Sequence, residues 1–337
     1  MNRPKSLSNN NGYLVYVPTR EDHYNYYAQH LCTVVCNNDQ TLTPLSRFEV
    51  PFHAHMVGFC NGMYFLVVHY SNIIYLWNPS IRKFKMLSIR RLTDPCAPAA
   101  TGLAYHSQNN DFKILRVVCD RESNVPLAVA EVYTLSTDSW RRFVISLRSI
   151  DYIDPLPCLF FNGALHSLAN HESDKFILSF DVNDEMFREI MLPQNYLDEV
   201  VDDVLDLAFE RLAVFKGSLA LFVFFLDAPG NSICHIWVMR EYGVVESWTK
   251  ISVPLDSVNN FNGCTDSGEL LICINGRGFI SYDLESLNEN DLGISHSWLI
   301  YTADLMENLV LLDQVKFHLN MRISLYTKSM TIFVKFN

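Results

Sequence analysis

Short apolar segments alternate with polar turns along residues 161–193, and this stretch sets the pattern for the rest of the chain. Asn162-Gly163 precedes one apolar segment, and a second follows in which Phe176, Leu178 and Phe180 occupy alternate positions. A period of two places these three side chains on one face of a β-strand. A polar turn then leads to a third apolar segment. Because Asn-Gly pairs and short polar turns join antiparallel strands, the pattern predicts a meander of three strands.

The same plan recurs about every 50 residues. A glycine, often after Asn, precedes an apolar segment at each of these positions: Gly12, Gly62, Gly102, Gly163, Gly217 and Gly263. The successive differences between these positions are 50, 40, 61, 54 and 46. Repeats of roughly 40–50 residues that each contain several strands are typical of propeller blades. We therefore expect an all-β, propeller-like repeat of short antiparallel sheets, with about six blades.

Stacked blades also explain why residues 219–226 are apolar at every position, since a strand packed between two neighbouring sheets is buried on both faces. Residues 297–301 are a candidate strand of the sixth unit. Residues 196–207 are the best helix candidate, although an inter-blade loop fits the all-strand background better. We expect a flexible segment at residues 1–10, one domain at 11–315, and a tail of uncertain structure at 316–337.

Composition and charge restrict the classes of function. The chain of 337 residues is 49% hydrophobic and 19% charged, which is typical of a folded core. Its formal net charge of -11 disfavours nucleic acid as a partner, because phosphate contacts need clustered Lys and Arg. The longest purely apolar run is far shorter than the roughly 20 residues of a membrane-spanning helix, so no membrane partner is expected.

The cysteines and the N-terminus indicate a compartment. There are 9 Cys, an odd number, and most lie in apolar strand patterns without a CxxC pair. Reduced, buried thiols are the simplest interpretation. Residues 1–11 show neither the apolar core nor the cleavage pattern of a secretory signal. A cytoplasmic or nuclear protein is expected.

An ordered series of segments resembles a known family. In sequence the segments are VGFCNGMYFLV, IIYLWNPSIRKFKML, TGLAYHSQNNDFKILRVV, AEVYTLSTDSWRRF, FFNGALHSLA, FILSFDVNDEMFREIMLP and IWVMREYGVVESWTKI. Their order and content resemble the F-box-associated (FBA) domain of plant F-box/kelch-repeat proteins over roughly residues 11–315. Kelch features are partial: there is no Gly-Gly doublet, while Tyr133 and Trp140 keep a kelch-like distance.

The resemblance implies a substrate receptor of an SCF-type E3 ubiquitin ligase. In that family an N-terminal F-box bundle attaches the propeller to a Skp-type adaptor and a cullin. Here the Leu-Pro and Lys-Ser-Trp segments of an F-box are missing, which implies a truncated product or a gene model begun at an internal Met1. Adaptor and cullin are therefore expected partners only if an F-box is encoded upstream.

Several residue groups have side chains that can bind metals or act in catalysis. His53 and His55 would share a strand face and could supply two metal ligands, but no third ligand is visible. The pairs Asp151/Asp154 and Asp202/Asp203 have the composition of an acid–base pair, yet they fall in polar loops and read as solvated charge. No Gly-x-Ser-x-Gly elbow occurs, and Gly276-Arg277-Gly278 reads as a turn. We therefore predict no catalytic, metal or cofactor residues.

Two surface groups point instead to recognition. Arg82, Lys83 and Lys85 form a small basic cluster that fits either a solvated turn or a contact to an acidic partner. Residues 20–29 carry Tyr24, Tyr26 and Tyr27. Tyr is favoured in recognition surfaces because it offers a large apolar face with a polar tip, although local packing explains these three equally well.

Loop lengths favour one end of the meanders for binding. In each unit, the loop after the first predicted strand and the tight turn after the second lie at opposite ends. The loops are longer and more varied than the turns, so a protein partner is expected at the end that bears the three tyrosines. The leading hypothesis is a non-catalytic receptor that recognises a target protein for ubiquitination. The alternatives are a propeller-fold enzyme, such as an oxidase or hydrolase, and an F-box-less receptor with no ligase link.

Overall fold

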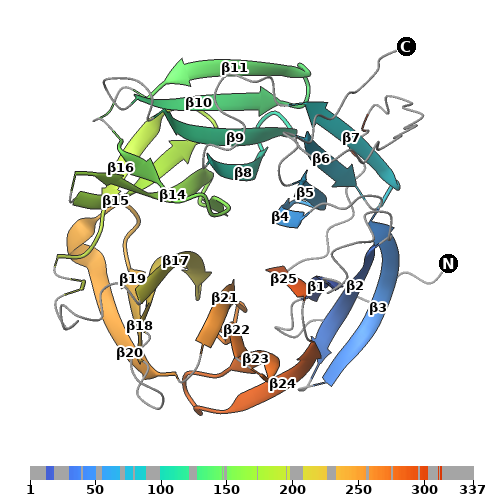
Figure 1. The fold of residues 1–337 in the computed structure, drawn as a ribbon, viewed down its shortest axis with the longest axis vertical. Coiled ribbons are helices and arrows are strands. Elements are labelled where there is room, and N and C mark those ends of the chain that lie inside the picture. Colours follow the sequence, from blue (N-terminus) through green and yellow to red (C-terminus); the bar gives the residue numbers. More distant parts are fainter. Residues whose placement is uncertain are drawn as a thin grey trace, which may run out of the picture.

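Six antiparallel sheets stand in a ring around a central axis in the computed structural model (Figure 1). The structure describes residues 13–18, 30–38, 41–50, 55–68, 73–78, 80–88, 99–120, 127–145, 147, 150–172, 174–194, 196–197, 208–225, 233–255, 258–274, 276–294, 297–302, 310 and 312. Each sheet is one blade of a β-propeller, so the expected fold class and the count of about six blades are confirmed.

The blades are numbered in chain order, and the strand bounds of the first three are as follows. Blade 1 contains β25 (Ser297–Thr302), β1 (Tyr13–Pro18), β2 (His30–Asn38) and β3 (Thr41–Val50). Blade 2 contains β4 (His55–Cys60), β5 (Met63–Val68), β6 (Ile73–Asn78) and β7 (Lys83–Ser88). Blade 3 contains β8 (Ala99–His106), β9 (Asp111–Asp120), β10 (Leu127–Thr134) and β11 (Ser139–Val144).

The second half of the ring follows the same plan, with one divided inner strand. Blade 4 contains β12 (Tyr152–Ile153), β13 (Leu159–Phe161), β14 (Ala164–His171), β15 (Asp174–Asp181) and β16 (Phe187–Met191). Blade 5 contains β17 (Ala208–Phe215), β18 (Ser218–Phe225), β19 (Ile233–Met239) and β20 (Trp248–Pro254). Blade 6 contains β21 (Val258–Cys264), β22 (Leu270–Ile274), β23 (Gly278–Tyr282) and β24 (Glu289–Ile294).

The ring is closed by the pairing of β25 with β1. Their antiparallel register runs from Tyr13 opposite Thr302 to Pro18 opposite Ser297. The assignment of this segment to the sixth unit is therefore wrong, because β24 completes blade 6 and β25 supplies the innermost strand of blade 1. Closure of this kind ties a strand that follows blade 6 in the sequence to the first blade.

Three of the recurring glycines, Gly62, Gly163 and Gly217, mark a turn inside a blade rather than its beginning. Asn61-Gly62 and Asn162-Gly163 each connect the innermost strand of a blade to the second, with φ of 47° and 76° in the first pair and 47° and 73° in the second. Two successive left-handed residues form the tight hairpin turn that matches strand twist. The innermost strands before these turns, such as β4 and β17, were therefore missed by units counted from the glycine.

Gly263 lies inside β21 rather than in a turn, and Gly102 is a further exception among the recurring glycines. Gly102 lies inside β8 and pairs with Leu115 of β9. A Cβ built at this position would stand 2.6 Å from Cys158 Cβ and 2.8 Å from a methyl carbon of Leu165. Glycine is required here by the close approach of blade 4, and not by a turn.

The hydrophobic core consists of layers between neighbouring blades. Phe222 of β18 packs toward blade 6, where its ring centroid is 4.4 Å from that of Phe261. The alternate residues Leu221 and Val223 pack toward blade 4, against Leu168 and its neighbours. Both faces of β18 are thus buried, as its continuous apolar sequence predicts.

The described residues contain one helical element, the three-residue 3-10 turn η2 (Val245–Ser247). Within this part of the chain no helix has the length and apolar character to cross a membrane. The helix candidate at residues 196–207 falls mostly outside the described residues. So do residues 1–12 and 313–337, with the expected flexible N-terminus and the C-terminal tail.

Antiparallel order gives the propeller two distinct ends. The third and fourth strands of each blade are joined by short turns at one end, which we call the turn end, and in blades 2 to 6 the first and second strands are joined there as well. The second and third strands are joined at the opposite end, the loop end, where the chain also passes between blades. For β15, the turn at residues 182–186 and the connection at 172–173 follow this rule, which confirms the predicted separation of the two ends.

Candidate functional site

The predicted partner-binding tyrosines Tyr24, Tyr26 and Tyr27 lie outside the described residues. The strands that flank them are described: β1 ends at Pro18 and β2 begins at His30, in the second and third positions of blade 1. The connection between these strands therefore leaves and re-enters the sheet at the loop end. The role of the three tyrosines stays a prediction.

Two cavities lie along the inner strands. The turn-end cavity has a volume of about 800 Å³ and is lined by the ends of β4, β17 and β21 and the turns that follow them. The loop-end cavity has a volume of about 300 Å³ and is lined by residues nearer the beginnings of these strands and by Asp154. Val57, Arg211 and Phe261 line both cavities. Volumes in this range are common among small-molecule sites.

Arg211 is the cation of the loop-end cavity. It lies in β17, and its guanidinium carbon is 5.1 Å from the centroid of the Phe209 ring. Nη1 donates a hydrogen bond of 2.8 Å to the carbonyl oxygen of Glu210. Burial lowers the pKa of Arg211, and the negative charges of Asp154 and Glu210 oppose this shift. The guanidinium stays charged at any physiological pH.

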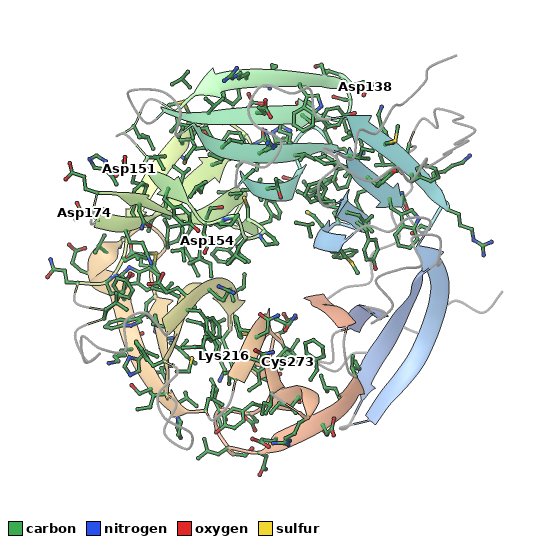
Figure 2. All side chains as sticks on the ribbon, in the orientation of Figure 1. Asp138, Asp151, Asp154, Asp174, Lys216 and Cys273 are labelled. Carbon is green, nitrogen blue, oxygen red and sulfur yellow. The ribbon has the colours of Figure 1, made fainter. Side chains whose placement is uncertain are left out.

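Asp154 supplies a carboxylate to the same cavity. Burial raises the pKa of Asp154, while the backbone N–H of Leu156 and the charge of Arg211 lower it. The N–H of Leu156 donates a hydrogen bond of 3.2 Å to Asp154 Oδ1. Asp151 instead accepts a bond from the N–H of Glu172 and lies farther from the centre of the ring (Figure 2). The structure therefore does not bring Asp151 and Asp154 together as a carboxylate pair, and Asp154 is less solvated than its loop position predicts.

His166 lines the loop-end cavity but is held as a structural group. Its Nδ1–H donates to the carbonyl oxygen of Leu159 at 3.2 Å, so Nε2 accepts the hydroxyl hydrogen of Tyr242 at 2.7 Å. Burial lowers the pKa of His166 to about 4, and the bond to Leu159 offsets this only partly. The imidazole is neutral at pH 7 and both of its nitrogens are engaged: the Nδ1 bond lies within blade 4, and the Nε2 bond joins blade 4 to Tyr242 of blade 5.

Cys60, Cys158 and Cys264 line the turn-end cavity. Burial raises the pKa of Cys60 and of Cys158 to about 12, and it raises that of Cys264 as well. Because the thiolate is the nucleophile and the metal ligand, these thiols are poorly suited to covalent chemistry at neutral pH. Six described cysteines are free thiols: Cys60, Cys119, Cys158, Cys234, Cys264 and Cys273.

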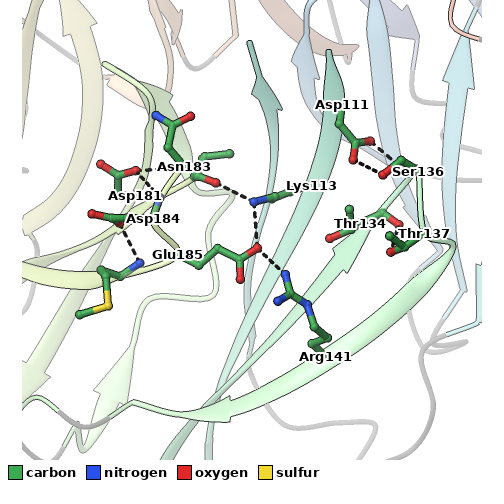
Figure 3. A network of polar contacts seen from close by, with 12 residues as sticks. Asp111, Lys113, Thr134, Ser136, Thr137, Arg141, Asp181, Asn183, Asp184 and Glu185 are labelled. Carbon is green, nitrogen blue, oxygen red and sulfur yellow. Dashed lines mark hydrogen bonds and ion pairs between the residues drawn. The ribbon is translucent and has the colours of Figure 1, made fainter. Parts of the chain in front are cut away.

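The turn end carries ion pairs that join neighbouring blades. In Figure 3, Lys113 of β9 reaches from blade 3 to the turn between β15 and β16 of blade 4, where it donates to Val182 O at 2.7 Å and to Glu185 at 2.8 Å. Arg141 of β11 pairs with the same carboxylate. Lys216 pairs with Glu285 at 2.9 Å across blades 5 and 6. Glu185, Lys216 and Glu285 thus hold neighbouring blades together from turns at this end.

The basic cluster divides in the structure. Lys85 is buried and pairs with Asp138 of blade 3 at 2.9 Å, so its interpretation as part of a solvated turn is wrong. Arg82 lies exposed in the turn before β7 with a φ of 53°. Gly276-Arg277-Gly278 forms the turn between β22 and β23, as predicted.

The remaining candidates give no site in the described part of the chain. His53 and the pair Asp202/Asp203 lie outside it, and His55 is the first residue of β4. Among the described residues, no three His, Cys, Asp or Glu side chains are grouped as a metal site would require. Arg211 was missed because its strand was missed: β17 reads Phe-Glu-Arg-Leu at its centre, and alternation there would have placed Glu210 and Arg211 on opposite faces.

Comparison with known proteins identifies one family. Residues 18–329 match the family model described as the F-box associated beta propeller domain. The match spans all six blades except the beginning of β1.

Curated relatives carry F-box names. The chain is 26% identical over 209 residues to the F-box/kelch-repeat protein At3g23880 of Arabidopsis thaliana, covering 59% of this chain and 52% of that protein. It is 24% identical over 269 residues to the F-box protein CPR1 of the same organism, covering 70% of this chain and 63% of that protein. The chain thus spans about half to two thirds of the length of these relatives.

Solved structures are similar only at a distance. The dipeptidyl peptidase 4 of Porphyromonas gingivalis aligns with a TM-score of 0.37 and 11% identity, over 82% of this chain and 43% of that one. A similarity of this degree carries no argument about chemistry.

Proposed function

Since this chain belongs to the F-box associated β-propeller family, we propose that it is the substrate receptor of an SCF-type ubiquitin ligase. In this role it holds a target protein at its loop end and performs no covalent chemistry itself. The observation that carries the proposal is the family match across residues 18–329. The F-box names of the relatives support it.

The chemistry of the described residues agrees with binding rather than catalysis. The cavity thiols are protonated at neutral pH, and both nitrogens of His166 are engaged in structural hydrogen bonds. Several turns at the turn end carry inter-blade ion pairs, whereas the loop end carries the connections at residues 19–29 and 121–126, which are longer than the turns at the opposite end of the same sheets. Binding residues are found disproportionately on such loops.

Attachment to a ligase would come from a separate element. A Skp-type adaptor and a cullin would be recruited through an F-box bundle, and the propeller would present the target. The proposal places the protein in the cytoplasm or nucleus. The free thiols of the six described cysteines are in keeping with a reducing compartment.

The test identifies target proteins by cross-linking and then measures how fast each of them is degraded. Proteins cross-linked to the chain in living cells would be identified, and their half-lives measured with the gene intact and disrupted. We expect at least one cross-linked protein to live several-fold longer after disruption while its transcript level stays constant. Unchanged half-lives for all cross-linked proteins would contradict the receptor proposal, and turnover of a small molecule by the purified chain would favour a propeller enzyme.

A further inference from the structure

Arg211 has donor capacity that the described part of the chain does not use. A guanidinium carries five N–H donors in a planar fork. In the described residues Arg211 uses one of them, in the bond from Nη1 to the carbonyl oxygen of Glu210. No carboxylate of the described residues lies within ion-pair distance of it, although its position over the Phe209 ring removes part of its hydration.

The neighbouring carboxylate of Glu210 does not neutralise Arg211, because it is held elsewhere. Consecutive residues of a strand point to opposite faces. The carboxylate of Glu210 pairs with Lys175 of blade 4, and it also accepts the hydroxyl hydrogen of Tyr196 at 2.8 Å. Asp154 interacts with Arg211 through its charge and accepts its hydrogen bond from the backbone N–H of Leu156. Arg211 therefore presents a positive charge to the cavity.

The rest of the cavity limits what Arg211 can bind. Met56, Leu212 and Phe261 give the wall an apolar character, while Asn260 adds an amide near the beginning of β21. A volume of about 300 Å³ admits a small organic group and excludes a folded segment. A planar anion that matches the guanidinium fork is the natural occupant, because Arg binds carboxylates through two parallel hydrogen bonds.

We propose that the loop-end cavity is a carboxylate-binding site in which Arg211 pairs with the ligand. Asp154 lines the same cavity, and its charge disfavours ligands with a second negative charge nearby. It favours ligands that carry an N–H or O–H donor beside the carboxylate. A free organic acid with an adjacent donor and the C-terminus of a peptide both present this chemistry. The site goes beyond target recognition as proposed above, because a free acid would occupy it whether or not a ligase is involved.

The test is isothermal titration of the purified full chain with matched probes. N-acetylglycine supplies a carboxylate beside an amide N–H, N-acetylglycinamide lacks the charge, and tetraglycine with a free or an amidated C-terminus represents a peptide. We expect N-acetylglycine to bind at least ten-fold more tightly than its amide. Equal affinity for acid and amide, or no binding of any acid, would overturn the proposal.

Variants assign the effect to Arg211. Arg211→Met should weaken acid binding at least ten-fold, and Arg211→Lys, which keeps the charge and loses the fork, should weaken it several-fold while preserving the fold. Arg142→Gln is the matched control, because it removes an exposed Arg from the outer strand β11, and it should leave binding unchanged. Wild-type affinity in the Arg211→Lys and Arg211→Met variants would overturn the proposal.

Two further sets of titrations define the class of ligand. Asp154→Asn should strengthen binding of the dianion malonate more than binding of N-acetylglycine, and a failure to do so would overturn the role of Asp154. Binding of tetraglycine only with a free C-terminus would identify peptide ends as occupants. Binding of N-acetylglycine without either peptide would restrict the site to free acids, and in both cases the carboxylate site is supported.

Discussion

The contact between Lys113 and Glu185 offers a sharp test of how the blades are held together. Lys113 lies in β9 of blade 3, and Glu185 lies in the turn before β16 of blade 4 (Figure 3). Glu185→Gln keeps the size of the side chain and removes its charge. Because Glu185 has a left-handed φ of 55°, a substitution of similar shape leaves the backbone cost nearly unchanged.

The expected loss of unfolding free energy follows from the burial of the two side chains. The side chain of Lys113 is 9% exposed and that of Glu185 is 18% exposed. Removing one partner of a fully buried pair costs about 3–5 kcal/mol, whereas an exposed pair is worth about 0–1 kcal/mol. Lys113 also keeps its bond to the Val182 carbonyl oxygen, and Gln can still accept a hydrogen bond. We therefore expect Glu185→Gln to lower the free energy of unfolding by about 2 kcal/mol.

The assay is urea unfolding followed by intrinsic fluorescence, supported by calorimetry. A loss of this size corresponds to a fall in melting temperature of roughly 4 °C for a domain of this length. Arg141→Gln is the control, since Arg141 pairs with the same carboxylate and its side chain is 53% exposed. That variant should lose no more than about 1 kcal/mol.

The pH dependence gives a second, independent readout. Burial alone would raise the pKa of Glu185, but hydrogen bonds from Lys113 and Arg141 outweigh it and bring the pKa below the ordinary value of 4.5. A carboxyl group with a lowered pKa in the folded state stabilises the fold above its unfolded pKa. That contribution is lost as the pH falls through the folded pKa. The difference in unfolding free energy between wild type and Glu185→Gln should therefore become smaller below about pH 4.5. Equal losses of unfolding free energy in Glu185→Gln and Arg141→Gln at pH 7 would refute the reasoning. So would a difference in unfolding free energy between wild type and Glu185→Gln that stays constant in acid.

Three further predictions follow from the described geometry and from the sequence. Gly163→Ala should lower the free energy of unfolding by about 1–2 kcal/mol, because Gly163 has a φ of 73° that Ala adopts only with strain. Urea unfolding measures this loss. In the control Arg82→Ala, the free energy of unfolding should change little, because a non-glycine residue already adopts a left-handed φ at that position. Cys60 and Cys158 should resist iodoacetamide in the native protein at pH 8 and react in urea, as followed by mass spectrometry, because burial raises the pKa of each to about 12; rapid native labelling of either would contradict the burial. The triple replacement of Tyr24, Tyr26 and Tyr27 by Ala should weaken binding of the target by roughly 2 kcal/mol or more in a titration, with little change in melting temperature, and a large fall in melting temperature would show that the tyrosines are packing residues.

The sequence was sufficient for the parts of the fold that depend on local patterns. Continuous apolar character predicted the doubly buried β18, and Asn162-Gly163 predicted a tight turn. Pairing between distant segments had no local signal, so β25 was assigned to blade 6 although it pairs with β1. The innermost strands were missed for a related reason. They line the central cavities and tolerate polar residues such as Arg211, which weakens the apolar pattern of a buried strand.

The candidate site was less accessible from the sequence than the fold. Asp151 and Asp154 lie in the same polar stretch of the sequence and look alike there. Only the arrangement of the blades shows that Asp154 lines a cavity and that Asp151 lies farther from the centre of the ring. The sequence separation of 72 between Lys113 and Glu185 likewise hides their contact. Local composition reports neither burial nor distance across blades, and these two quantities decide which charged groups are structural and which are available to a ligand.

The most direct test of target recognition at the loop end is hydrogen–deuterium exchange of the chain with and without the cross-linked target. The account predicts slower exchange of the amides in the connections between second and third strands and between blades, with no change in the turns at residues 61–62, 162–163 and 182–186. Protection confined to those turns, or no protection anywhere in the presence of saturating target, would contradict it.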